Sequence, residues 1–257
     1  MKLAAWPHGW QHRYEHTHSA NREYSFILAT DQIHPDSCCA SHRFEIHSGD
    51  IGLADTEEAR KDKVPRERSE MAQFGADQKE GDVDWYAWSF FVPLEFPESV
   101  RPGRRAWPYI TLTQFMQRPG TDGRHLPALV FAKWIDGDFQ LRQFPHLGED
   151  SPCWRLISNS DFRGRWHDLL VKVKWTDQAD GSIDVWVNGR KCVHETLPTR
   201  TSEAGSIYHK YGLYRIADQT HGPAVAYFSQ LRRGKSRAEV ASLSFLNRIC
   251  DIKTLLV

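Results

Sequence analysis

Three separated segments of the chain carry residue types that suit the binding of a carboxylate and the transfer of a proton. Their sequences are RSEM at 68–71, TQFMQ at 113–117 and YHKYGLYR at 208–215. In an extended strand, residues four apart project from the same face, so Lys210 and Tyr214 are expected side by side. Each pattern alone is common in proteins. Their joint presence in this order indicates a site for a carboxylate-bearing ligand.

The elements that must position these segments have the pattern of short β-strands. Residues 166–175 alternate between apolar and polar side chains, which is typical of a half-buried strand. Asp180-Gly181 and Asn188-Gly189 then introduce turns, and an Asn-Gly pair between alternating runs is a strong hairpin signal. Further strands are expected at 24–30, 41–47, 84–92 and 109–115, and helical periodicity is confined to 237–246. Many short strands without alternating helices predict an all-β sandwich or jelly roll of antiparallel strands.

The totals fit one globular domain spanning 1–257, in which 1–20 is a polar and flexible N-terminal segment. Sandwiches of 257 residues are ordinary, and the net charge of zero points to neither a nucleic acid nor a membrane partner. No apolar run approaches the ~20 residues that span a bilayer. Most of the ten tryptophans are expected in the core, with a few in a sugar-binding groove. The charged segment 55–68 is expected to be an exposed loop, except for Arg68.

The remaining motifs offer little chemistry. The five cysteines form no CxxC pair, and adjacent Cys38 and Cys39 do not easily bridge each other, so mostly free thiols are expected and one or two bridges stay open. The histidines near the N-terminus have no HExxH spacing. The acidic loop 177–180 could hold calcium but is no EF-hand.

The three segments resemble strands of the jelly-roll polysaccharide lyases, the group that includes heparin lyase I, glucuronan lyases and alginate lyases with related folds. Those enzymes carry R-x-E-L, Q-x-H and Y-x-K-x-G-x-Y strands, and the order here is the same. The wider frame is similar in RFEIHSGD at 43–50, WYAWSFFVP at 85–93, WHD at 166–168, VWVNG at 185–189 and LRRG at 231–234. The resemblance covers roughly residues 24–240 and implies a concanavalin-like sandwich with a concave substrate groove.

The resemblance also implies a reaction, the β-elimination of a 4-linked uronic-acid polysaccharide. A base removes the C5 proton, an acid protonates the departing O4, and neutralising the carboxylate stabilises the enolate-like state. Arg68 and Gln114 are expected to neutralise the carboxylate. Tyr214 is the expected base or acid, favoured as phenolate by nearby Lys210 and Arg215. The predicted substrate-binding residues are Glu70, Tyr208, Arg215, His146 and Gln117.

One position departs from the family pattern, because Met116 stands where the second segment usually has histidine. Methionine can neither abstract a proton nor bind a carboxylate. Tyr214 could then act as both base and acid, or another histidine could substitute; the candidates are His42, His47, His125 and His146. A site that binds without cleaving is the third and less favoured outcome.

The rival activities lack their motifs or keep only part of the site. A retaining glucanase needs two carboxylates about 5–5.5 Å apart, and no E-x-D-x-x-E strand is present. A non-catalytic carbohydrate-binding module would keep the groove and dispense with Tyr214. The expected partner is an acidic polysaccharide bound by a monomer, with no required cofactor and room for a structural calcium ion. Family resemblance implies a secreted or periplasmic protein, although no signal-peptide core is visible.

Overall fold

The computed structural model describes residues 13–17, 22–37, 40–56, 63–75, 77–98, 109–121, 126–134, 137–143, 152–217 and 222–241. Most of the expected N-terminal segment 1–20 therefore lies outside the described residues. Within it, Arg13–Thr17 forms a strand paired in a β-sheet, so the expectation of a flexible segment is wrong there.

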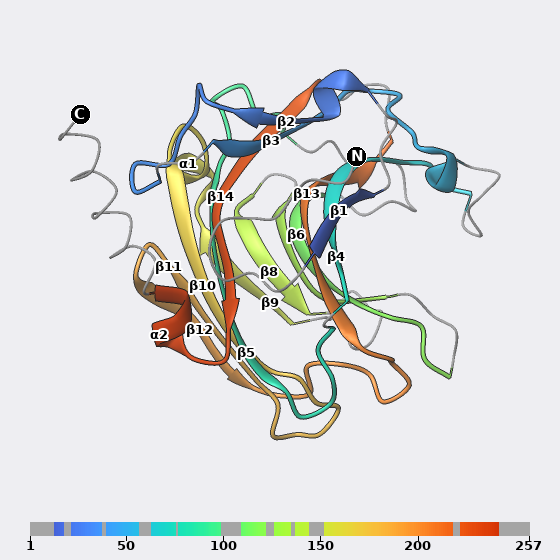
Figure 1. Ribbon diagram of the computed structural model, residues 1–257, viewed down its shortest axis with the longest axis vertical. Coiled ribbons are helices and arrows are strands. Elements are labelled where there is room, and N and C mark those ends of the chain that lie inside the picture. Colours follow the sequence, from blue (N-terminus) through green and yellow to red (C-terminus); the bar gives the residue numbers. More distant parts are fainter. Residues whose placement is uncertain are drawn as a thin grey trace.

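Two antiparallel sheets of seven strands each lie face to face (Figure 1). The first sheet has the order β1 (Arg13–Thr17), β4 (Arg66–Phe74), β13 (Ile207–Ile216), β6 (Tyr109–Gln117), β7 (Pro127–Trp134), β8 (Phe139–Gln143) and β9 (Cys153–Ile157). The second has the order β12 (Arg190–Thr196), β11 (Ser182–Val187), β10 (Trp166–Lys174), β5 (Val83–Phe91), β14 (Ala224–Gly234), β3 (Ser41–Ile46) and β2 (Phe26–Ala29). The helical elements described are short: η1 (Glu23–Ser25), η2 (Leu53–Asp55), α1 (Asn159–Phe162) and α2 (Arg237–Ala241). The predicted all-β sandwich is confirmed.

The hairpins expected between 166 and 195 are present as β10, β11 and β12. Asn188 and Gly189 connect β11 to β12 with positive φ angles of 49° and 82°. A two-residue hairpin turn of this kind needs positive φ at both central residues, which asparagine and glycine tolerate best. The Asn-Gly pair thus sets the pairing of β11 with β12, which has a bulge after Val185.

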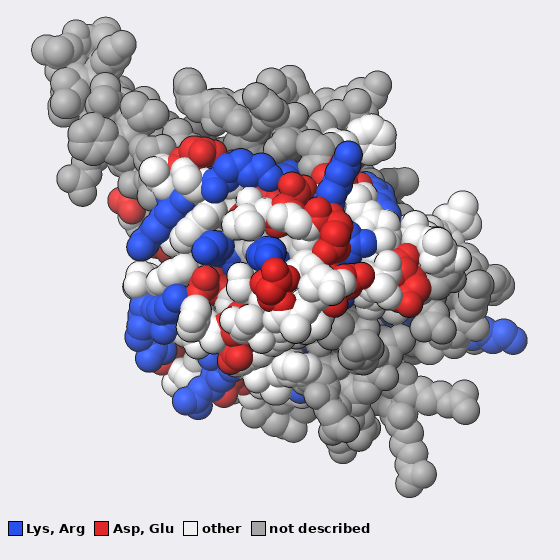
Figure 2. Space-filling view, turned by 90° about the horizontal axis from the view of Figure 1, so that it is seen from below, with Lys and Arg blue, Asp and Glu red and all other residues white. Residues whose placement is uncertain are grey.

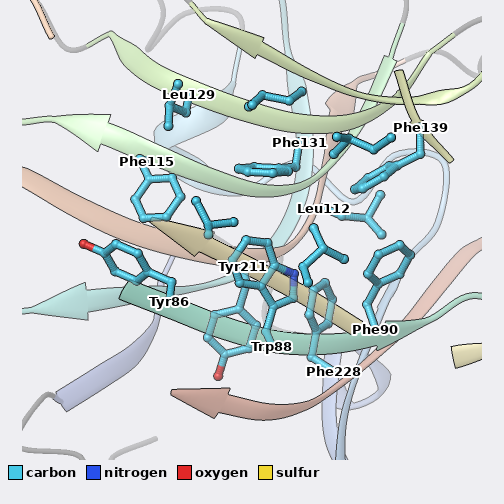
Figure 3. Packing of buried hydrophobic residues seen from close by; sticks show 14 of the residues in the cluster. Tyr86, Trp88, Phe90, Leu112, Phe115, Leu129, Phe131, Phe139, Tyr211 and Phe228 are labelled. Atoms are coloured by element: carbon cyan, nitrogen blue, oxygen red, sulfur yellow. The ribbon is translucent and has the colours of Figure 1, made fainter. Parts of the chain in front are cut away.

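The core between the sheets is predominantly aromatic. Rings from both sheets point toward one another, including Trp88 and Phe90 of β5 and Phe131 of β7 (Figure 3). Trp88 meets Phe131 edge-on at a centroid distance of 5.3 Å, a geometry that aromatic pairs favour. Full burial of one such side chain contributes about 1.5–3 kcal/mol. Apolar burial between the sheets therefore fixes which face of each strand turns inward.

Two histidines lie within this core, each bonded to a tyrosine. The Nδ1 atom of His209 lies 2.9 Å from the Tyr14 hydroxyl, and that of His42 lies 2.9 Å from the Tyr211 hydroxyl. Burial lowers the pKa of both histidines to about 3. Both rings are therefore neutral in the folded protein at ordinary pH.

The described surface seen in Figure 2 shows acidic and basic side chains interspersed among uncharged ones. This agrees with the formal net charge of zero. No helix in the described part of the chain is both long and apolar enough to span a membrane.

The buried histidines predict an acid-sensitive fold. Their pKa is lower in the folded state than the ordinary value of 6.5, so the unfolded chain binds protons first as the pH falls. The unfolding free energy should therefore decrease below about pH 6.5, by up to about 1.4 kcal/mol per pH unit for each histidine. Urea unfolding between about pH 6.5 and 5.5, above the range where most carboxylates titrate, measures this slope. His209→Gln should reduce the slope, and an unchanged slope would contradict the assignment.

Candidate active site

Strand alternation separates two sets of side chains on β13. Tyr211 and Leu213 belong to the core between the sheets. The contacts of Tyr208, Lys210 and Tyr214 place these three on the opposite side, called here the outer face of the first sheet. The sequence prediction that Lys210 and Tyr214 share a face therefore agrees with the structure.

Glu70 of β4 lies at the centre of the polar contacts on the outer face. Its carboxylate accepts a hydrogen bond from Lys210 Nζ at 2.5 Å and one from Gln114 Nε2 at 2.6 Å. Arg68 Nη1 lies 3.5 Å from the same carboxylate. Glu70 is only 1% exposed, and Gln114 and Lys210 are buried as well. The predicted residues from three separate segments therefore form one compact group, named here the Glu70 cluster: Arg68, Glu70, Gln114 and Lys210.

Charge within the Glu70 cluster follows from burial and pairing. Burial alone would raise the pKa of Glu70, but the ammonium of Lys210 and the guanidinium of Arg68 outweigh it and lower that pKa. Burial lowers the pKa of Lys210, with Glu70 acting in the opposite direction. Glu70 is therefore an anion that holds its donors in place.

Arg68 is fixed from a second side by a residue that the sequence analysis assigned to an exposed loop. Its Nη2 atom lies 2.6 Å from Asp55 Oδ1, and the Asp55 side chain is 3% exposed. The expectation of an exposed charged loop is wrong at Asp55, because the short helix η2 turns this carboxylate inward to pair with Arg68. The inward direction of Asp55 depends on the backbone conformation of η2, and the pattern of charges along the sequence does not reveal it.

Tyr214 contacts two guanidinium groups. Arg66 Nε donates a hydrogen bond of 2.8 Å to the phenol oxygen, and the guanidinium carbon of Arg68 lies 4.5 Å from the ring centroid. These are the cations beside Tyr214, in place of the expected Lys210 and Arg215. Sequence reasoning missed Arg66, although alternation along β4 puts it on the same face as Arg68 and Glu70.

Two of the predicted binding residues, Arg215 and Gln117, contact other partners than the Glu70 cluster. Arg215 is 1% exposed and pairs with buried Glu67 at 2.6 Å, on the core side of β13. The side-chain oxygen of Gln117 accepts a hydrogen bond of 2.8 Å from the backbone of Thr201. His146 lies outside the described residues.

Tyr208 stays on the outer face, where Arg118 covers its ring at 3.8 Å. Burial raises the pKa of Tyr208 to about 12. Its phenol is therefore neutral and better suited to contact a ligand than to transfer a proton.

The backbone conformation and the close packing at position 212 require glycine. Its φ is +132°, and a Cβ atom at this position would lie 2.3 Å from the backbone oxygen of Ser69. The pairing of β13 with β6 shifts register between Tyr211 and Tyr214. Gly212 thus lets β13 lie close to β4 at the point where its pairing with β6 is irregular.

The candidate histidines that the structure describes lie elsewhere. His42 is in the core, and His47 bonds to Glu45 and stacks on Tyr24 at 4.2 Å. The other two candidates, His125 and His146, lie outside the described residues. Met116 sits on β6 opposite Tyr208. Among the described residues, Tyr214 is thus the group in the best position to transfer a proton.

A second group of outer-face residues also escaped the sequence analysis. Tyr109 of β6 and Trp134 of β7 are cross-strand partners whose rings stack at 5.0 Å. The guanidinium of Arg142 on β8 lies 3.6 Å from the Trp134 ring centroid. Their spacing along the chain gives no motif, and only the strand register brings them together.

The described residues contain no group of three or more histidine, cysteine, aspartate or glutamate side chains placed to hold a metal ion. Cys153 and Cys192 are free thiols, and the other cysteines lie outside the described part of the chain.

Glu70→Gln tests the central role of the buried carboxylate. The neutral amide keeps the shape but leaves Lys210 as a buried cation without its anion. Removing one partner of a buried ion pair costs about 3–5 kcal/mol, so chemical denaturation should show a loss of this size. The exposed pair of Lys174 with Asp180 offers a control, because Asp180→Asn should cost about 1 kcal/mol or less. Equal losses in the two variants would contradict a central role for Glu70.

Comparisons with known proteins agree with this architecture. The sequence matches the polysaccharide lyase family over residues 6–232. The structure is similar to an endo-β-1,4-glucuronan lyase from the fungus Trichoderma reesei, with a TM-score of 0.64 and 16% identity over 88% of this chain and 96% of that one. It is also similar to an alginate lyase from Pseudomonas aeruginosa, with a TM-score of 0.54 and 18% identity over 84% and 88%. No curated protein matches the sequence.

At such identities the solved structures establish the jelly-roll fold, and the family match carries the assignment further. It spans most of the chain, including β4, β6 and β13, on which the Glu70 cluster and Tyr214 lie. The chain is a member of the polysaccharide lyase family, an enzyme that acts on polysaccharides.

Proposed function

We propose that the protein cleaves a 4-linked uronic-acid polysaccharide by β-elimination, with Tyr214 as both the base and the acid. The observation that carries this proposal is the placement of the Tyr214 phenol oxygen. It receives a hydrogen bond from Arg66 and lies on the same sheet face as the Glu70 cluster. Proton transfer and carboxylate binding can therefore act on one sugar residue.

The proposed reaction uses one proton at one side chain. The Tyr214 phenolate takes the C5 proton of the uronate, the C4–O4 bond breaks, and a C4=C5 double bond forms. The phenol then gives the same proton to O4 of the departing chain. This requires the proton and the leaving group to lie on the same side of the sugar ring. Arg66 stabilises the negative charge on the phenol oxygen before the proton arrives.

The carboxylate of the reacting uronate must be neutralised by hydrogen-bond donors that can form further hydrogen bonds. Lys210 and Gln114 each have N–H groups beyond the one that Glu70 accepts. Arg68 Nε is buried and has no hydrogen-bond partner among the described residues. A ligand carboxylate could complete these contacts. Glu70 and Asp55 then serve as positioning residues that hold the donors, and no cofactor is needed for the step.

The kind of polymer is narrowed by the local charge balance. Arg68 and Lys210 pair with carboxylates, and so does Arg118 with Asp77. Among the outer-face cations that the structure describes, this leaves Arg142 over Trp134 without a carboxylate partner, which is little surplus positive charge for a densely sulfated, heparin-like chain. A polymer charged only by carboxylates, such as those cleaved by the glucuronan and alginate lyases of similar structure, fits better. We further propose that the chain acts as a single-domain monomer outside the cytoplasm, as family resemblance implies.

Tyr214→Phe tests the proposal. Elimination creates an unsaturated uronate that absorbs in the near ultraviolet, so a panel of purified polyuronates should reveal a substrate as an absorbance rise. General acid–base catalysis contributes about 10²–10⁴-fold, and loss of a residue with both roles should lower kcat by at least about 10³-fold while binding persists. Tyr227→Phe, on β14 of the other sheet, is the matched control and should leave the rate unchanged.

Other outcomes would point to the rival activities. New reducing ends without an absorbance rise would identify a hydrolase. Binding of a polyuronate with neither product would identify a carbohydrate-binding protein. An absorbance rise that survives Tyr214→Phe would leave elimination standing and remove Tyr214 from it.

A further inference from the structure

Beside the proposed active site, two aromatic rings and an arginine form a stacked group. Tyr109 stacks on Trp134 at an interplanar angle of 25°, and Arg142 covers the Trp134 ring. They come from the adjacent strands β6, β7 and β8 of the first sheet. These three residues are named here the Arg142 platform.

Arg142 differs in its partners from three other cations of the outer face. Arg68, Lys210 and Arg118 each form an ion pair with a carboxylate. Arg142 forms none with any carboxylate that the structure describes, and its Nε atom is buried without a hydrogen-bond partner in that part of the chain. Its positive charge is stabilised by a cation–π contact with the indole ring of Trp134 instead.

Stacking also prepares this guanidinium for a ligand. The five N–H donors of arginine lie in the plane of the group, so a ring packed against the plane leaves the donor edges open. Those edges match the two oxygens of a carboxylate and can bind it bidentately. The rotamer entropy that a long side chain normally loses on binding is reduced here, because Trp134 already restricts Arg142.

The Arg142 platform lies within reach of the reacting sugar. Tyr109 lies between the two sites. Burial raises its pKa, and the groups close enough to influence that pKa are Tyr214 and Arg66 on one side and Arg142 on the other. Strand β8 is three strands from β13, and Arg142 leans over Trp134 on β7. The guanidinium is therefore about two strand spacings, ~10 Å, from the line of Tyr214. One polysaccharide chain can cross both.

We propose that Arg142 binds the carboxylate of a second uronate in the same polysaccharide chain, and that Tyr109 and Trp134 position it. This inference rests on the proposed elimination at Tyr214 and adds a specificity-determining residue to it. The substrate is then a polymer that presents uronate carboxylates at more than one residue along the stretch bound by the enzyme.

Binding measurements in a non-cleaving background test the inference. In Tyr214→Phe, calorimetry with an oligoglucuronate and an oligomannuronate should show a Kd that rises about 10- to 100-fold when Arg142→Gln is added, since a hydrogen bond to a charged group contributes about 1.5–3 kcal/mol. Arg142→Lys should lie between the two, because an ammonium cannot bind bidentately. Arg155→Gln, which removes an exposed arginine of β9, is the matched control and should leave Kd unchanged.

The neutral cello-oligosaccharide of equal length separates charge from shape, and its Kd should not respond to Arg142→Gln. In the cleaving enzyme, Arg142→Gln should raise KM with a smaller effect on kcat. A fall in kcat as large as that of Tyr214→Phe would overturn the inference, because Arg142 would then act on the reacting uronate itself. So would an unchanged Kd and KM in a protein with an unchanged melting temperature.

The two proposals fail in different ways. Arg142-dependent binding of oligouronates by a protein that yields no unsaturated product supports the carboxylate site and removes the elimination. An absorbance rise that depends on Tyr214 but not on Arg142 keeps the elimination and removes the second carboxylate site.

Discussion

The buried carboxylate of Glu70 is the interaction on which the proposed active site depends. A charge removed from water is costly unless it is paired and hydrogen-bonded, and here donors from β6, β13 and β4 itself meet that requirement. The arrangement is possible because the three strands are adjacent in one sheet, although their residues are far apart in the sequence. The Glu70 cluster is therefore assembled by the pairing of the three strands.

The sheet also explains how two different tasks share β13. Its inward residues, such as Tyr211, are held by the aromatic core, while Lys210 and Tyr214 face the other way. The bulge at Gly212 separates them and needs both a positive φ and close contact with the backbone of β4. Core packing thus holds the inward side of β13, and strand alternation places Tyr214 on the outer face, where it contacts Arg66.

Much of this was predictable from sequence because it depends on local patterns. Alternation and the Asn188-Gly189 turn predict the hairpins, and the residue spacing on β13 predicts the shared face of Lys210 and Tyr214. The partners of these residues were harder to find, because they depend on register and turns between distant segments. Asp55 resembled a solvated charge. Arg215 was expected beside Tyr214, but strand alternation and the pairing with Glu67 place it on the core side. Of the seven tryptophans described, only Trp88 and Trp175 are fully buried, since indoles also serve as stacking surfaces for cations on outer faces.

The tyrosine–histidine pairs of the core have a consequence for how the enzyme meets acid. His209 lies on β13, the strand that also carries Lys210 and Tyr214, and His42 bonds to Tyr211 of that strand. Protonation of either ring would place a positive charge in the core, behind the strand that carries the proposed catalytic residues. The pH below which activity is lost would then depend on the stability of the fold around β13. Substitutions in the core that do not contact a substrate would shift that pH.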